Sequence, residues 1–129
     1  LNEYAETARR FVWNELADWY VESTKGRLAG PDATAADREV ARAVLVHAFD
    51  HALRLLHPIV PFITEAVWQR LPGRAPGAFI TTAAWPTPAG HADDAGAEAF
   101  ELVRAAVGGI RQVRSDYAVA PGKTIDATL

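Results

Sequence analysis

Two histidines and an aspartate near the middle of the chain have the spacing of a metal site. His47 and His51 are four residues apart, which places both on one face of a helix, and Asp50 lies beside them. Two imidazoles at this spacing can share a zinc ion. Ala48 stands where a zinc protease has its glutamate, and no third ligand is identifiable. We therefore predict no metal site and interpret both histidines as core or helix-interface residues; a metal-binding helical protein is the distant alternative.

A third histidine opens a segment that contains two prolines, His57–Glu65 (HPIVPFITE). Pro58 disfavours helical angles at His57, so the preceding helix should end there. Pro61 has its φ angle pre-set for a first helical turn, so a new helix should begin near it. We predict a buried elbow between packed helices, with a His57 ring nitrogen capping a free carbonyl at the helix end. The structural motif of this region comprises His57, Pro58, Pro61, Phe62, Glu65 and Trp68.

The composition excludes several other kinds of chemistry. With no cysteine, the chain can form no disulfide, thiolate metal site or cysteine nucleophile, and it is compatible with a reducing cytoplasm. No serine lies in a nucleophile-elbow context and no glycine loop could hold a phosphate, so we expect no catalysis. No apolar run is long enough to span a membrane. Methionine is absent and Leu1 already lies in a helical pattern, which indicates a piece of a longer protein.

Aromatic and basic side chains could bind RNA locally, although the net charge of −3 argues against a wholly basic surface. Trp13 lies off the main apolar stripe of its predicted helix, one turn from Arg9 and Arg10, so a base and a phosphate could be held together there. Core packing is the alternative for the aromatic residues, and a solvated face is the alternative for the cations. The candidate contacts are Arg9, Arg10, Trp13, Lys25, Arg27, Arg111, Arg114 and Lys123.

Apolar periodicity predicts a mainly α chain with antiparallel helices over about 2–24, 35–56 and 61–70. Lys25-Gly26-Arg27 should close the first helix, Thr34 and Asp37 should cap the second, and Phe62, Ile63, Ala66, Val67 and Leu71 should form the apolar side of the third. Residues 79–85 favour a short strand, and 86–92 form a linker. A fourth helix after Asp93-Asp94 contains Gly108-Gly109, where another backbone should approach closely, and 124–129 resemble a second strand. We expect a helical bundle over 1–78 and a small α/β subdomain with one helix over 79–129.

Two of these stretches resemble a known family. The runs Phe11–Glu22 (FVWNELADWYVE) and Leu53–Trp68 (LRLLHPIVPFITEAVW) are similar to helices that follow the catalytic domain in valyl-tRNA synthetases. Trp85-Pro86 follows at the expected place, and Ile110–Arg114 with Ala120–Lys123 is similar to their next helix and turn. Isoleucyl and leucyl enzymes share the architecture but more often have Ala-Pro in place of His57-Pro58. Ala17 departs from the cysteine often found there.

The resemblance implies the anticodon-binding domain of a class I synthetase, with its first helices missing, followed by a subdomain truncated at its C-terminus. The partners implied are tRNA and the catalytic domain of the same chain, without DNA or membrane, in the cytoplasm. The parent enzyme would use ATP and Mg²⁺, while no cofactor is expected in this chain, which lacks the His-Ile-Gly-His and Lys-Met-Ser-Lys-Ser signatures. The alternative is a structural spacer of a valyl, isoleucyl or leucyl enzyme with little RNA contact.

Overall fold

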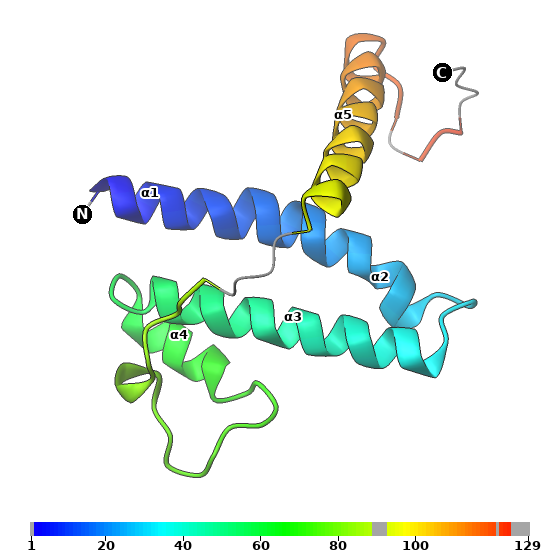
Figure 1. The fold of residues 1–129 in the computed structure, drawn as a ribbon. Helices are drawn as coiled ribbons and strands as arrows, with labels where there is room; N and C mark the ends of the chain where they lie inside the picture. Colours follow the sequence, from blue (N-terminus) through cyan, green and yellow to red (C-terminus); the bar gives the residue numbers. More distant parts are fainter. Residues whose placement is uncertain (1, 89–92, 121, 125–129) are drawn as a thin grey trace. The chain divides into compact units, whose positions relative to one another are not determined.

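The computed structural model describes residues 2–88, 93–120 and 122–124 (Figure 1). The chain divides into two compact units, Leu1–Pro88 and Ala89–Leu129. The described residues are mainly helical, which confirms the predicted class, and they contain no β-strand. None of the helices in these ranges is both long and apolar enough to cross a membrane.

The first unit begins with three helical segments that follow one another without a break (Figure 1). They are α1 (Asn2–Arg10), the π-helical η1 (Phe11–Val21) and α2 (Glu22–Ala29). In a π-helix the hydrogen bond spans five residues, so each turn is wider than in an α-helix. Phe11, Leu16 and Val21 are five residues apart, and Leu16 in the middle is 4% exposed. Leu16 is the one buried residue of η1.

The first helix continues past the predicted end at Lys25-Gly26-Arg27 to Ala29. Gly26 is inside the helix, and Gly30 closes it with extended angles (φ −65°, ψ 151°). The Gly30 N–H donates to the Gly26 carbonyl at 2.9 Å. A Cβ on Gly30 would lie 2.3 Å from that carbonyl oxygen, so the close approach of the backbone requires a glycine here. Pro31 then prevents a further helical turn.

The central helix, α3 (Ala35–Leu56), runs antiparallel to the first helix and packs against all three of its segments (Figure 1). Its start confirms the predicted capping box. The Asp37 N–H donates to the Thr34 hydroxyl oxygen at 3.1 Å, and the Thr34 N–H donates to the Asp37 carboxylate at 3.3 Å. Because α4 (Pro61–Trp68) also packs on α3, this helix occupies the middle of the unit.

The buried face of α4 is different from the predicted one. Thr64 and Trp68 are 1% and 4% exposed, whereas Phe62 and Ile63 are 90% and 64% exposed. The elbow therefore exists with the expected proline at the first turn of α4, but its apolar side chains are not its buried ones. Trp68 instead forms the core with Leu53 and Ile80.

The predicted strand at 79–85 is wrong. Ile80–Thr82 form a single 3₁₀ turn, η2, because the Thr82 N–H and the Thr82 hydroxyl both donate to the Phe79 carbonyl. Ile80 is drawn into the core beside Leu53 and Trp68, and no neighbouring strand is available in the described ranges to pair with it. Burial of Ile80 thus overrides the β-propensity of the segment. The second predicted strand, 124–129, lies outside the described residues except for Thr124, which is not in a strand.

The described part of the second unit is built on α5 (Asp94–Asp116). As predicted, an acidic residue caps its start, because the Asp93 carboxylate accepts from the Gly96 N–H at 2.9 Å. Gly108 and Gly109 lie within the helix, but a Cβ on either would meet nothing within 4 Å. The close backbone approach that we expected at these glycines is therefore not found in the described part of the chain.

Candidate nucleic-acid interface

Asp50 is the centre of the polar network that holds the first unit together. Its Oδ1 accepts from the indole Nε1–H of Trp68 at 2.7 Å and from the Arg74 guanidinium at 2.7 Å. Its Oδ2 accepts from the Arg54 guanidinium one helical turn along α3. Arg74 also lies over the Trp68 ring, 4.6 Å from the centroid, and Arg54 donates to the Ala84 carbonyl at 2.7 Å. One carboxylate therefore connects α3, α4 and the two segments that follow α4.

The charge of Asp50 is favoured in this environment. Burial by itself raises the pKa of the Asp50 carboxyl, but hydrogen bonds from Trp68 and Arg54 and the positive charges of Arg54 and Arg74 outweigh it. The pKa is consequently below its usual value. The network is thus an ion-paired structural centre, in which Trp68, Arg54 and Arg74 donate to one carboxylate.

His57 makes two side-chain contacts at the elbow. Its Nδ1 lies 2.8 Å from the Thr64 hydroxyl oxygen, and its Nε2 lies 2.9 Å from the Thr81 hydroxyl oxygen. The Thr64 hydroxyl already donates to the carbonyls of Val60 and Pro61, at 2.9 and 3.1 Å, so it accepts the Nδ1–H of His57. The predicted ring-to-carbonyl cap is therefore wrong: His57 links α3, α4 and η2 through two hydroxyl groups.

Glu65 connects α4 to η2. Its Oε2 accepts from the Ile80 N–H at 3.0 Å, which satisfies a backbone donor at the start of η2. Its Oε1 accepts from the Gln69 amide at 2.6 Å, and that amide also donates to the Ala78 carbonyl. The recognisable motif around the elbow thus serves to attach the segment 78–84 to the helices.

His47 and His51 contact each other without forming a metal cluster. Their ring centroids are 4.1 Å apart, and the His51 Nδ1 lies 3.0 Å from the His47 carbonyl oxygen. Asp50 is 3.8 Å from the His51 ring but already accepts from three donors. No group of three or more possible ligands gathers in the described ranges.

The residues of the first helix that we predict to contact RNA differ from one another in their partners. Trp13 is 70% exposed and extends from η1. Arg9 pairs with Glu6 at 3.0 Å, whereas Arg10 is exposed and has no side-chain partner in this part of the structure. Arg10 and Trp13, which are three residues apart, are therefore both accessible to a ligand.

The two predicted contacts at the end of the first helix both lie near acids. Lys25 pairs with Glu22 at 2.6 Å, and both side chains are exposed. Arg27 is exposed and lowers the pKa of Asp37, to a smaller extent than the hydrogen bonds from Thr34 do. Burial raises the pKa of the Tyr20 hydroxyl, and the charge of Arg27 partly opposes that rise. The positive field of both cations is thus reduced by groups of the same chain.

The three remaining predicted contacts belong to the second unit. Arg114 donates to the carbonyls of Ala120 and Lys123, the latter at 2.9 Å, and so holds the turn after α5. The Lys123 N–H donates to the Ala120 carbonyl at 3.0 Å, as expected for a turn. Arg111 is exposed on α5. Arg114 thus has a structural contact that the sequence analysis did not anticipate.

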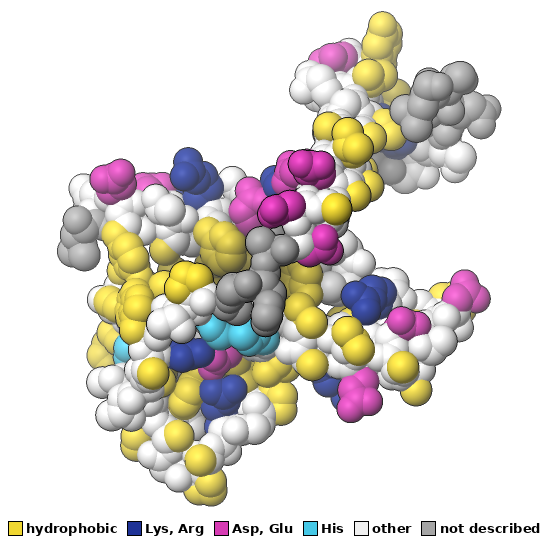
Figure 2. Space-filling view, in the orientation of Figure 1, with side chains coloured by type: hydrophobic (Ala, Val, Ile, Leu, Met, Phe, Trp, Pro, Cys, Tyr) yellow, Lys and Arg dark blue, Asp and Glu magenta, His cyan; other side chains and the backbone are white. Residues whose placement is uncertain are grey.

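Cations do not form one continuous strip on the face of the first unit seen in Figure 2. There the dark blue side chains are separated by hydrophobic and acidic ones. An RNA held on this face would therefore be contacted at separate points.

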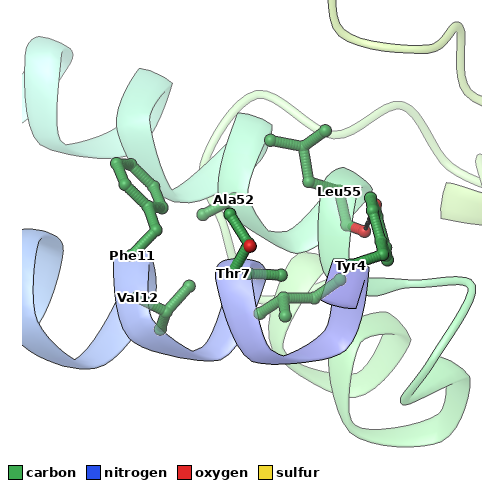
Figure 3. Close-up of a pocket in the computed structure, with 8 residues that line it drawn as sticks. Tyr4, Thr7, Phe11, Val12, Ala52 and Leu55 are labelled. Carbon is green, nitrogen blue, oxygen red and sulfur yellow. Dashed lines mark hydrogen bonds between the residues drawn. The ribbon is translucent and has the colours of Figure 1, made fainter. Parts of the chain in front are cut away.

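An apolar pocket of about 240 Å³ lies between the first helix and α3 (Figure 3). The Tyr4 hydroxyl donates to the Leu55 carbonyl across it, and Phe11 forms part of its wall. Tyr4 and Phe11, which line this pocket, are 37% and 46% exposed. The lining contains no charged side chain and offers no chemistry. The lining residues are Tyr4, Thr7, Ala8, Phe11, Val12, Ala52, Leu55 and Leu56.

Comparison with known proteins shows what class of domain this helical arrangement belongs to. The family model described as the anticodon-binding domain of tRNA ligase matches residues 1–129, and the chain belongs to that family. Among its relatives are proteins named Valine--tRNA ligase from Geobacter sulfurreducens (44% identical over 130 residues) and from Syntrophotalea carbinolica (41% over 129 residues). Each alignment covers 99% of this chain. A Valine--tRNA ligase from Streptomyces coelicolor is 39% identical over 120 residues, which cover 92% of the chain.

The chain spans only a small part of these relatives. The alignments cover 14% of the Geobacter and Syntrophotalea proteins and 13% of the Streptomyces protein.

Proposed function

We propose that this chain is the anticodon-binding domain of a valine–tRNA ligase, which binds valine tRNA and positions it for aminoacylation catalysed by other domains. The observation that carries the proposal is the match of the whole chain, 1–129, to the anticodon-binding family, together with about 40% identity to proteins named Valine--tRNA ligase. ATP and Mg²⁺ would be used by the catalytic domain of the same polypeptide. We place the enzyme in the cytoplasm, with which a cysteine-free chain is compatible.

Within the chain, we propose that the helical bundle of residues 1–78 carries the main RNA contacts. Residues 79–88 belong to the same compact unit, whose core includes Ile80, and 89–129 form the smaller unit. Arg10 and Trp13 are the best supported contacts of the predicted set, because Trp13 is 70% exposed and Arg10 has no described side-chain partner. A stacked base on Trp13 would be worth about 1–3 kcal/mol, and Arg10 one turn away would meet a phosphate. Arg9, Lys25, Arg27, Arg111, Arg114 and Lys123 remain candidate contacts; Arg9 and Lys25 already pair with acids.

The first experiment is aminoacylation by the full-length gene product that contains this chain. Supplied with ATP, Mg²⁺ and unfractionated tRNA, the protein should charge tRNA with valine far better than with isoleucine or leucine. Charging with isoleucine or leucine instead would overturn the valyl assignment.

The second experiment separates RNA binding from the spacer alternative. Trp13→Ala in the full-length protein should raise the KM for tRNA by about 5- to 150-fold, the equivalent of one lost stack, while Trp13→Phe should retain most of the binding. Tyr117→Ala, which removes another exposed aromatic side chain, is the matched control. An unchanged KM after Trp13→Ala and after Arg10→Gln would remove both residues from the binding surface and favour a spacer.

A further inference from the structure

A pair of cations outside the predicted set lies on the first half of α3. Arg38 and Arg42 are both exposed, and neither side chain has a hydrogen-bond or ion-pair partner in the part of the chain that the structure describes. They are four residues apart, which places them one above the other on the same helix face with a rise of about 6 Å. By contrast, Arg9, Lys25, Arg54, Arg74 and Arg104 all pair with carboxylates.

Both arginines line an open groove of about 690 Å³. Small side chains of α3, Ala35, Ala43 and Val46, line it as well, and Pro72 contributes from the segment after α4. The eleven residue steps from Ala35 to Val46 correspond to about 16 Å of helix, which is much longer than one phosphate group. The groove therefore suits an extended, negatively charged chain better than a single anion.

The segment that carries Pro72 is held in place by the Asp50 network. Two residues after Pro72, Arg74 forms an ion pair with Asp50 at 2.7 Å and lies over the Trp68 ring. Gly73 between them has a φ angle of +80°, which the turn requires and which favours glycine. Pro72 is therefore fixed close to the hub of the unit, and a ligand would meet a preformed groove.

We propose that this groove binds the phosphate backbone of RNA, with Arg38 and Arg42 contacting successive phosphates. The inference rests on the proposed function, since membership of an anticodon-binding family makes RNA the expected polyanion, and it adds a contact surface distinct from Arg10 and Trp13. Guanidinium groups bind phosphate oxygens with strong, charge-assisted hydrogen bonds. Such contacts position the RNA without reading its sequence.

Replacement of Glu39 should change RNA binding in the opposite direction to replacement of the two arginines, because the Glu39 carboxylate also lines the groove. It lies next to Arg38 and three residues before Arg42, yet it forms no ion pair with either of them. A carboxylate in this place repels a phosphate, so its neutralisation should tighten RNA binding. A merely structural role for the groove would produce no such gain.

The experiment measures tRNA binding and aminoacylation by the full-length protein at several salt concentrations. The double variant Arg38→Gln/Arg42→Gln should reduce the slope of log K against log salt by about 1.4–1.8, the value for two lost phosphate contacts. At about 0.1 M salt this corresponds to roughly 25- to 60-fold weaker binding, seen as a higher KM for tRNA at unchanged kcat. Arg38→Lys/Arg42→Lys should retain most of the affinity, and Glu39→Gln should bind more tightly than the parent protein.

The outcomes separate this inference from the proposed function. If the parent protein charges tRNA with valine but the double glutamine variant keeps the same KM and salt slope, the groove is not a phosphate site and the proposed function stands. If the parent protein neither binds nor charges tRNA, both fail. A lower kcat at unchanged KM, or equal losses in the glutamine and lysine variants, would also overturn the inference, because those results indicate altered folding or docking.

Discussion

Replacement of Asp50 tests whether one buried carboxylate holds the first unit together. In Asp50→Ala the guanidinium groups of Arg54 and Arg74 lose their anion and the Trp68 indole N–H loses its acceptor. Removal of one member of a buried ion pair costs about 3–5 kcal/mol. The two arginine side chains are 17% and 23% exposed, so water can relieve part of that penalty. We therefore expect a loss of about 2–4 kcal/mol in the free energy of unfolding.

A second variant, Asp50→Asn, separates the loss of the negative charge from the loss of the hydrogen-bond acceptor. Its side-chain oxygen can still accept from the Trp68 indole, but the negative charge is gone and its amide group would face a guanidinium. The loss should therefore lie between about 0.5 kcal/mol and the alanine value. Urea unfolding followed by circular dichroism gives the free energy, and hydrogen exchange of the Trp68 indole N–H reports on the hub itself. Asp32→Asn, an exposed acid without a described partner, is the matched control.

The contribution of Asp50 should also depend on pH. Because the pKa of this carboxyl is lower in the folded chain than its usual value of about 3.9, the unfolded chain binds the proton more tightly. The stabilisation is therefore complete above the unfolded pKa and is lost as the pH falls through the lower, folded pKa. The difference in stability between the parent chain and Asp50→Asn should shrink over that acidic range. A difference that is below about 0.5 kcal/mol at neutral pH, or that grows on acidification, would refute the role assigned to the carboxylate.

Three further predictions concern the elbow and the end of the first helix. Neutral His57 should carry its proton on Nδ1, as detected by nitrogen NMR, and His57→Ala should cost about 1–3 kcal/mol because the Thr64 hydroxyl oxygen loses its donor. Phe62→Ala should change the unfolding free energy of this chain by less than about 0.5 kcal/mol, because the side chain is 90% exposed; a loss like that of a core phenylalanine would contradict its position. Gly30→Ala should cost about 1–3 kcal/mol in a thermal or urea unfolding experiment, since the added Cβ would lie 2.3 Å from the Gly26 carbonyl oxygen; an unchanged midpoint would show that the turn relaxes freely.

The helices could be predicted because local signals determine them. Thr34 with Asp37 at the start of α3, Pro61 at the first turn of α4 and Asp93 before α5 all act through neighbouring backbone groups. These effects are visible in a few consecutive residues. The predicted end of the first helix at Gly26 is wrong, because a glycine inside a helix costs only about 1 kcal/mol against alanine and the close backbone approach at Gly30 is not visible in the sequence.

The interior of the first unit was harder to predict because it depends on contacts between distant residues. Asp50 and Arg74 are 24 positions apart, and neither periodicity nor charge pairing at helical spacing connects them. The sequence shows only that Asp50 and Arg54 have the i,i+4 spacing of an ion pair on a helix, which is typical of an ordinary surface pair. The structure shows in addition that the Trp68 indole donates to the same carboxylate. Long-range burial likewise turned a β-favouring segment around Ile80 into a 3₁₀ turn.

The elbow shows how a motif can be recognised correctly and yet interpreted wrongly. Its apolar residues suggested a corner closed by hydrophobic contact, but Phe62 and Ile63 face solvent in this chain and so contribute little to closing it. What joins α3, α4 and η2 instead is a set of polar contacts from His57 and Glu65, together with the buried indole of Trp68. Hydrogen bonds specify direction more strictly than apolar contacts do. The polar residues of the motif therefore determine the angle of the corner, and through Arg74 the same network holds the segment that carries Pro72 beside the groove on α3.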